Sequence, residues 1–440
     1  MRSTRLLFAL TTLLASHAAI AQFSQQGPKL VGADAAGAAA QGEAVALSGD
    51  GNTAIVGGHL DSSGFGAAWI WTRNGGVWTQ QGSKLVGAGG VIGPGYLAVD
   101  QGRAVALSAD GNTAIVGGCY DNDGVGAAWI WTRSQGIWSQ QGPKLVGSGY
   151  VPNFAASGCC DGVPTADVFQ GWTVALSGDG NTAIVGGPGD NGRAGAVWIW
   201  TRSGGVWTQQ GPKLVGSGSV KVGIQTAQQG SSVAISGDGN TALVAGIGAG
   251  ERVGALWVWT RSGGVWSQQG ARLVASDPVE SGYQGTSAAL SADGNTAMTR
   301  AFSGGVWVWT RSGDVWTQQG TKLVGTGASE SAIQGWSVAL SGDGNTAMIG
   351  GPFDSGDNTG SAWLWTRSGG IWRQQGNKLF GSGADGKTQF GASVSLSADG
   401  KTAIVGGSAS LYTLKTGIGA AWVFVSEEPV PSNRRRGINH

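Results

Sequence analysis

The chain has 440 residues, of which 41% are apolar, 12% are charged and 83 are glycine, and its formal net charge is +1. The apolar content excludes a disordered chain, and the absence of a Gly-X-Y period excludes collagen. Near-neutral charge gives no electrostatic reason to expect a nucleic acid or an anionic membrane as a partner.

Residues 1–21 are typical of a secretory signal peptide. Two arginines precede the short apolar run Leu6–Leu14, and Ala19-Ile20-Ala21 is a small-x-small cleavage site. The apolar run is too short to span a membrane comfortably, and no later stretch qualifies as a span. We therefore expect a mature chain beginning near Gln22, without a membrane span, that is secreted or held at the cell surface, with the periplasm as a further location.

The mature chain is organised as a repeat. The stretch Val-Ala-Leu-Ser-Gly-Asp-Gly-Asn-Thr-Ala-Ile-Val-Gly-Gly at 45–58 recurs with small changes. Its turn aspartate falls at Asp50, Asp110, Asp179, Asp238, Asp293, Asp343 and Asp399. A unit of this length cannot bury a core alone, so we expect the repeats to share one.

Each unit contains four predicted strands. In the first unit they are strand A at Gly42–Ser48, B at Thr53–Val56, C at Gly66–Arg73 and D at Val77–Val86, joined by Asp-Gly and Gly-Gly turns. Strand B is apolar on both faces, whereas strand D is polar and its Lys84 suits an exposed sheet edge. The pattern predicts an all-β fold, a seven-bladed β-propeller of four-stranded antiparallel blades.

The ends of the chain indicate how the ring closes. Phe23–Val31 is a strand D with no A, B or C before it, and Gly391–Phe424 supplies A, B and C with no D after them. We expect the N-terminal strand to close the last blade. An open solenoid would need capping repeats with a polar outer face, and neither end has one. The propeller thus covers 22–425, and 426–440 is predicted to be a disordered tail.

Strand alternation separates two faces of the ring. The variable B–C and D–A loops form one, called here the loop face, and the short A–B and C–D turns form the turn face. Cys119 lies in a B–C loop, and Cys159 and Cys160 lie in the following D–A loop. An exported chain permits a disulfide, and we hypothesise one between Cys119 and one of the other two, which leaves an odd thiol.

Three segments of the last unit, Phe390–Leu396, Thr402–Gly407 and Gly419–Phe424, resemble the FG-GAP repeat. Val185–Pro188 is similar to the Gly-Ala-Pro signature of that repeat, and the resemblance covers about Phe23–Val425. FG-GAP repeats build the seven-bladed propellers of integrin α chains and of bacterial exported proteins. The resemblance therefore implies an exported binding or adhesion protein.

Some FG-GAP members bind calcium through several Asp and Asn ligands in the A–B turn. Here that turn, Gly49–Asn52, offers one carboxylate, whereas calcium requires six to eight oxygens. We interpret Asp50 and its counterparts as turn formers, and we expect no metal and no cofactor.

The sequence shows no set of catalytic residues. Outside the signal segment it has only His59, interpreted as a surface residue, and His440, which excludes a multi-histidine zinc site. The B–C loops carry acids that we expect to be solvated, and that could bind a cation or a basic partner. They are Asp61, Asp121, Asp123, Asp190, Asp354 and Asp357. A pair of them could cleave a glycosidic bond, which keeps an enzyme as an alternative.

Of 21 tryptophans, most lie at fixed positions in strands C and D, which is typical of packing between blades. Trp172 and Trp336 fall outside this pattern, at the start of strand A, where a ring could stack on a sugar at the mouth of the channel. Arginines that end strand C are expected to be structural. They are Arg73, Arg133, Arg202, Arg261, Arg311 and Arg367.

The leading expectation is a non-catalytic exported propeller whose loop face binds or adheres to an extracellular protein. One alternative is a lectin-like propeller that binds a glycan through Trp172 and Trp336. The other is a carbohydrate-active enzyme that uses loop carboxylates. The sequence leaves the ligand and the oligomeric state open.

Overall fold

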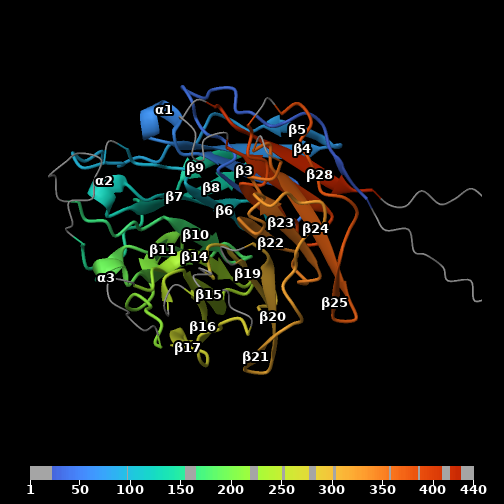
Figure 1. Cartoon of the computed structure of the whole chain (residues 1–440). Coiled ribbons are helices and arrows are strands. Elements are labelled where there is room, and N and C mark those ends of the chain that lie inside the picture. Colours follow the sequence, from blue (N-terminus) through green and yellow to red (C-terminus); the bar gives the residue numbers. More distant parts are fainter. Residues whose placement is uncertain are drawn as a thin grey trace, which may run out of the picture.

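The protein is an all-β ring of seven four-stranded antiparallel blades, as the repeats predict (Figure 1). The structure is a computed structural model that describes residues 22–96, 98–153, 165–218, 226–249, 253–276, 284–300, 304–355, 358–384, 387–408 and 417–427. The expected signal segment, Cys159, Cys160, Asp357 and most of the predicted tail lie outside these residues. The first and last blades lie side by side in the ring.

The blades are numbered in chain order, and in each the innermost strand comes first. Blade 1 is β2 (Ala44–Leu47), β3 (Thr53–Gly58), β4 (Ala67–Asn74) and β5 (Val77–Gln80); blade 2 is β6 (Ala104–Leu107), β7 (Thr113–Gly118), β8 (Ala127–Ser134) and β9 (Ile137–Gln140); blade 3 is β10 (Thr173–Leu176), β11 (Thr182–Gly187), β12 (Ala196–Ser203) and β13 (Val206–Gln209); blade 4 is β14 (Gln229–Ile235), β15 (Thr241–Gly246), β16 (Ala255–Ser262) and β17 (Val265–Gln268).

Blades 5 to 7 follow the same plan. Blade 5 is β18 (Ala288–Leu290), β19 (Thr296–Arg300), β20 (Val306–Ser312) and β21 (Val315–Gln318); blade 6 is β22 (Ser337–Leu340), β23 (Thr346–Gly351), β24 (Ser361–Ser368) and β25 (Ile371–Gln374); blade 7 is β26 (Ser393–Leu396), β27 (Thr402–Gly407), β28 (Ala420–Ser426) and β1 (Phe23–Gln25). Strand D is shorter than expected, because a Gln-Gly turn interrupts it and only Leu85 bridges back to Ala68.

The N-terminal strand closes the last blade, as predicted. Strand β1 pairs antiparallel with β28, with Phe23 opposite Ser426 and Gln25 opposite Phe424. The sheet therefore reaches Ser426, one residue beyond the expected end of the propeller. Phe23 is buried with Phe424 and Phe390 in the core of blade 7. The two ends of the chain are thus held in one sheet, and the ring has no open edge.

The Asp-Gly turn is built by its own polar residues. Asp50 Oδ1 accepts hydrogen bonds from Ser48 Oγ at 2.5 Å and from the Asn52 backbone N–H at 2.9 Å, as an aspartate turn former does. Gly51 has a φ of +67°, and a Cβ there would lie 2.9 Å from Thr402 of blade 7. Glycine is therefore required both by the turn and by the close approach of the neighbouring blade.

The residues that precede the turn aspartates form a closed ring of backbone hydrogen bonds. Each N–H donates to the carbonyl of the next blade at 2.8 to 2.9 Å, and the seventh returns to the first. The ring runs through Gly49, Ala109, Gly178, Gly237, Ala292, Gly342, Ala398 and back to Gly49. Every blade therefore contributes one donor and one acceptor to the same ring of bonds on the turn face.

A second contact joins neighbouring blades at the turn face, and we call it the arginine clamp. Gln81 Oε1 of blade 1 accepts from Arg133 Nη1 at 3.1 Å and from Trp138 Nε1 at 2.9 Å, both in blade 2. The Arg133 guanidinium also stacks over the Trp138 ring and donates to Asn112 of its own turn. The arginines that end strand C are structural, as expected.

The clamp recurs at six of the seven junctions. The other five pairs are Arg73–Gln26, Arg202–Gln141, Arg261–Gln210, Arg311–Gln269 and Arg367–Gln319. In blade 7 the positions of the arginine and the tryptophan are taken by Ser426 and Phe23, which face each other in the same register. Among the described residues, the junction between blades 6 and 7 therefore has no arginine clamp.

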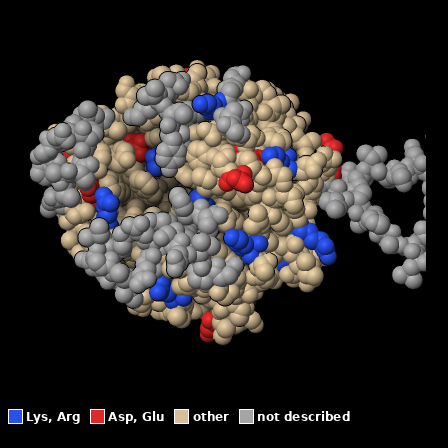
Figure 2. Space-filling model, viewed as in Figure 1, with Lys and Arg blue, Asp and Glu red and all other residues tan. Residues whose placement is uncertain are grey.

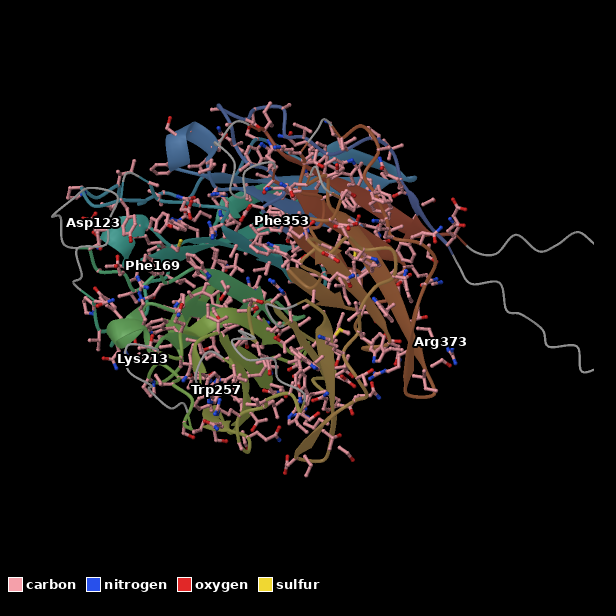
Figure 3. The ribbon with its side chains drawn as sticks, viewed as in Figure 1. Asp123, Phe169, Lys213, Trp257, Phe353 and Arg373 are labelled. Atoms are coloured by element: carbon pink, nitrogen blue, oxygen red, sulfur yellow. The ribbon has the colours of Figure 1, made fainter. Side chains whose placement is uncertain are left out.

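The first tryptophan of strand C forms the core between blades. Trp69 is fully buried in a cluster that joins strands A and B of its own blade to β27 and β28 of blade 7. Its equivalents are buried in the same way, and they are Trp129, Trp198, Trp257, Trp307, Trp363 and Trp422. The periodic tryptophans are packing residues, and residues on the outer strand such as Arg373 lie at the periphery (Figure 3).

Closure by β1 yields the first prediction. Phe23→Ala should lower the free energy of unfolding by about 3–5 kcal/mol, because it leaves a cavity in the core of blade 7. The measurement is denaturant unfolding followed by tryptophan fluorescence. Ser24→Ala, one residue along the same strand, is the matched control and should change the value by about 0.5 kcal/mol or less. Equal effects of the two variants would show that β1 does not close the blade.

Candidate functional site: the channel mouth of the loop face

The B–C loops of blades 1 to 3 each form a single tight turn. The turns are α1 (Asp61–Gly64), α2 (Asp121–Gly124) and α3 (Asp190–Arg193), and each contains two residues with left-handed backbone angles. The turns fold the first aspartate inward, beneath the loop. Asp61, Asp121 and Asp190 are at most 1% exposed, as is Asp354 in blade 6. The expectation that these four acids are solvated is therefore wrong.

Each of these aspartates is paired with the lysine of strand D in its own blade. The Nζ–Oδ2 distances are 2.6 Å for Lys84–Asp61 and 2.5 Å for Lys213–Asp190, beside α3 (Figure 3). The other two pairs are Lys144–Asp121 and Lys378–Asp354. Lys84 thus neutralises a buried carboxylate and does not guard a sheet edge, which corrects the sequence interpretation. A buried carboxylate needs such a partner because an isolated charge is costly there.

The second oxygen of each carboxylate fixes the loop that enters the blade. Asp61 Oδ1 accepts from the Ala36 backbone N–H at 2.7 Å, and Asp354 Oδ1 accepts from Ser329 N–H at 2.7 Å. Burial alone would raise the pKa of Asp354, but hydrogen bonds from Lys378, Ser329 and Ser361 outweigh it and hold the pKa at about 2. Asp123 likewise accepts from the Gly95 backbone N–H. These aspartates build the loop face and are already bonded within it.

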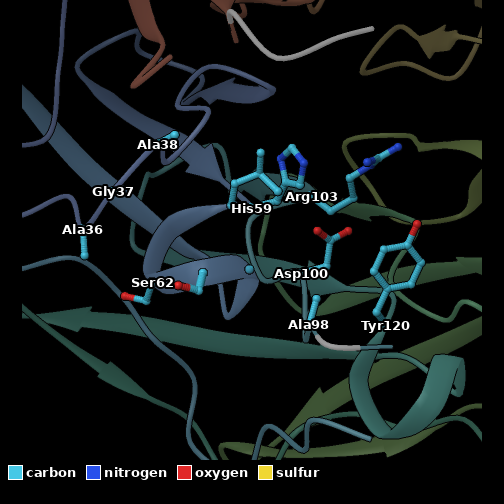
Figure 4. A pocket seen from close by; sticks show the side chains of 12 residues that line it. Ala36, Gly37, Ala38, His59, Ser62, Ala98, Asp100, Arg103 and Tyr120 are labelled. Carbon is cyan, nitrogen blue, oxygen red and sulfur yellow. The ribbon is translucent and has the colours of Figure 1, made fainter. Parts of the chain in front are cut away.

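A cavity of about 700 Å³ opens on the loop face between blades 1 and 2, and we call it the mouth pocket. Its wall includes His59, Asp100, Arg103 and Tyr120, which surround one opening (Figure 4). His59 is only 7% exposed and its Nδ1 is buried without a hydrogen-bond partner. The expectation that His59 is a surface residue is therefore wrong, because its loop turns the ring inward.

Arg103 is the prominent charged group of the mouth pocket. Its guanidinium lies 4.6 Å from the centroid of the Trp172 ring in blade 3. Burial lowers its pKa, but the nearby carboxylates of Glu43 and Asp100 outweigh this and raise the pKa above the usual arginine value. Among the described residues its side chain has no hydrogen-bond or ion-pair partner. A stacked, cationic guanidinium whose N–H groups bond to no described residue is suited to bind a ligand.

Two further groups lie at the floor of this region. The Cys119 thiol donates to Asp100 Oδ2 at 3.3 Å and is fully buried, and burial together with Asp100 raises its pKa well above the usual value. Glu43 Oε2 is buried without a hydrogen-bond partner. Cys119 is a free thiol in the structure, and because its hypothesised partners lie outside the described residues, the disulfide stays a prediction.

An aromatic cluster borders the mouth pocket. Tyr96 and Tyr120 stack with ring centroids 4.5 Å apart, and Phe169 packs edge-on against both. Phe169 in turn contacts Trp172 at 6.1 Å. Trp172 is therefore one of four aromatic rings in contact, and it is half-buried. Arg103 stacks on Trp172 and lines the pocket.

Trp336 lies three blades away from Trp172, so the two predicted ligand residues do not form one site. Its ring is half-buried between the Arg300 guanidinium at 5.5 Å and the edge of Phe353 at 5.4 Å. Each of the two tryptophans thus packs against an arginine and a phenylalanine. That packing reduces the ring surface that a sugar could use.

The missed site residues carry a partial signal in the repeats. His59 and Cys119 occupy the position held by Pro188 in blade 3, at the end of strand B. Arg103 and Trp172 follow the same Gln-Gly pair in their blades, as Glu43 does in blade 1. When the seven repeats are aligned, these two positions differ from blade to blade while the positions around them vary little. Such variation marks the channel mouth.

Hydrogen bonds of the glutamine side chain explain why most units have Gln-Gly where the FG-GAP pattern has Phe-Gly. Gln101 Oε1 accepts from the Gly87 N–H at 2.6 Å, and its Nε2 donates to the Gly87 carbonyl at 3.0 Å. The amide thus pairs with the backbone of the entering loop. In blade 7, Phe390 takes this position and packs against Trp422 and Phe424.

Comparison of the chain with models of known protein families finds no match, and comparison with curated proteins finds none either. Within the described ranges, no three His, Cys, Asp or Glu side chains are grouped so that they could hold a metal ion. None of the described helices is long and apolar enough to cross a membrane. Over the described part of the face shown in Figure 2, blue and red side chains are few and dispersed, and some of opposite sign adjoin one another.

The buried ion pairs predict a specific pH dependence. Asp354→Asn should lower the free energy of unfolding at pH 7 by about 3–5 kcal/mol, because it leaves Lys378 beside a neutral group. The folded pKa of Asp354, about 2, lies below the ordinary value of 3.8, so its stabilisation is complete above about pH 4 and is lost as the pH falls towards 2. The difference between the wild type and the variant should shrink over that interval in urea unfolding.

The control for this prediction is Glu330→Gln, which alters an exposed carboxylate on the preceding loop and should change the free energy at pH 7 by about 0.5 kcal/mol or less. A difference between wild type and Asp354→Asn that stays constant from pH 7 to pH 2 would contradict the assignment of the ion pair.

Proposed function

We propose that the protein is a non-catalytic, exported binding propeller of the FG-GAP type, whose loop face recognises an extracellular partner protein. The seven-bladed fold is consistent with a protein-interaction role. Export and FG-GAP membership rest on the N-terminal segment and on the repeat resemblance. Because folds host many functions, the proposal depends on the site rather than on the fold.

The observation that carries the proposal is Arg103 in the mouth pocket. Its guanidinium is stacked on Trp172 and has no partner among the described residues, and it lies in a cavity of about 700 Å³ beside the unpartnered Nδ1 of His59. Rigid aromatic and arginine groups in a desolvated cavity are typical of the anchors of protein interfaces. The turn face lacks such a feature among the described residues, since its arginines are held in the clamps.

Site-specific photocrosslinking tests this proposal. A photoreactive amino acid at Ser63, exposed on the loop face, should form a covalent adduct with a partner from the outer surface of the source cells. The same residue at Ser134, exposed on the turn face, should not. Arg103→Gln should weaken the capture at least about tenfold, because charged hydrogen bonds would be lost. Equal adducts from both faces, or capture unchanged in Arg103→Gln, would contradict the proposal.

A second candidate is a lectin that uses the same pocket. It is favoured by the aromatic wall that Trp172, Phe169 and the two tyrosines form next to Arg103. It predicts specific binding of the full mature chain on a glycan array. Binding should be lost in Trp172→Ala and retained in Trp336→Ala, because Trp172 stacks on Arg103, which lines the pocket, whereas Trp336 stacks on Arg300. Binding that depends on both tryptophans would contradict the geometry.

The enzyme alternative required a pair of free loop carboxylates. Four of the six acids that it drew on are paired with lysines, and Asp123 accepts from backbone N–H groups. No observation on the described loops favours glycoside cleavage, so we do not propose it.

A further inference from the structure

Blade 5 lacks most of its B–C loop. Between Ala301 and Gly304 the chain has two residues, whereas blade 1 has seven between Gly58 and Gly66. Neither of the two residues of blade 5 is acidic, so this blade has no counterpart of Asp61. The loop that buries an aspartate in four other blades is thus missing here.

The lysine that would pair with this aspartate is nevertheless present. Lys322 occupies the position of Lys84, directly before the leucine that bridges strand C in both blades. It is half-buried, as its four paired equivalents are, and a Cβ on Gly305 would lie 3.1 Å from its Cδ. Among the described residues Lys322 has no ion-pair or hydrogen-bond partner. Lys322 thus occupies the position of the paired lysines, without a carboxylate from the residues that the structure describes.

The missing loop leaves room beside this lysine. A cavity of about 720 Å³ is lined by Lys322, Gly304, Gly305 and the loop between Gly325 and Gln334. Glu330 also lines the cavity, but it is exposed and forms no ion pair with Lys322 within 4 Å. We call this cavity the blade 5 pocket. It lies on the loop face, since B–C and D–A segments form it.

We propose that the blade 5 pocket receives an aspartate side chain carried on a loop of the partner protein. This inference rests on the proposed function and names the chemistry of the recognised segment. In the complete blades, Asp61 and its equivalents reach the lysine from a tight turn of only a few residues, so the repeat itself shows which group the position accepts. A charge-assisted bond to an ammonium that no described residue pairs gives the contact its specificity.

The probe is a peptide copied from the chain itself, acetyl-Leu-Asp-Ser-Ser-Gly-amide, which reproduces Leu60–Gly64 with its aspartate. NMR titration of the mature protein should show saturable binding of this peptide. Replacement of the peptide aspartate by asparagine should weaken binding at least about tenfold, as should Lys322→Gln in the protein. The proposal would be overturned if the wild type bound the two peptides with equal affinity. It would also be overturned if Lys322→Gln bound the aspartate peptide as tightly as the wild type does.

Two further measurements control the experiment. Lys322→Gln should leave the melting temperature close to the wild-type value, whereas Lys84→Gln should lower it by several degrees, because only Lys84 neutralises a buried aspartate. Glu330→Gln should bind the peptide at least as tightly as the wild type, because it removes a competing negative charge. Acetate that binds as tightly as the peptide would instead indicate a general anion site and would overturn the role of a loop.

The outcomes separate this inference from the proposed function. If the adduct at Ser63 forms and depends on Arg103 while Lys322→Gln changes neither capture nor peptide binding, the inference fails and the proposed function stands. If the peptide binds through Lys322 while no partner is captured through the loop face, the pocket is confirmed as a carboxylate site and the proposed function fails.

Discussion

The closed ring of seven backbone hydrogen bonds on the turn face is the constraint on which the rest of the structure depends. Each turn N–H donates to the carbonyl of the next blade, so the position of every turn depends on both of its neighbours. Hydrogen bonds within each Asp-Gly turn set the conformation of the turn. The arginine clamps and the buried tryptophans, which lie farther from the axis, hold neighbouring blades together. The turn face is thus uniform because its bonds leave no freedom, and variation is confined to the loop face.

The fold could be predicted because its signals are local and repeated. The Asp-Gly turn recurs seven times and the tryptophan pair of strand C recurs six times, so the pattern of each unit can be checked against the others. The incomplete units at the two ends likewise indicated the pairing of β1 with β28, which is confirmed. The predicted strand D is too long, because no change in hydrophobicity marks the Gln-Gly turn that interrupts it.

The site was harder to predict because burial in a loop follows from backbone angles that composition does not reveal. Left-handed residues turn Asp61 beneath its loop, and nothing in a string of polar residues distinguishes this from a solvated turn. The same turn carries His59 inward. Trp172 breaks the pattern of the repeats, and it stacks on Arg103 of the mouth pocket. Trp336 breaks the pattern in the same way, yet it stacks on Arg300, three blades away.

The pairing of β1 with β28 also fixes when the molecule can be completed. Phe23 and its partner Ser426 are separated by nearly the whole chain, so the last blade cannot form during synthesis until the final strand has emerged. At rates of about 5–20 residues per second, that interval is roughly 20–80 s. Throughout it, the first strand must remain unpaired while six blades assemble. The pairing that forms last therefore lies inside blade 7, between β1 and β28, so a nascent ring would stay open at that one place until β28 has been made.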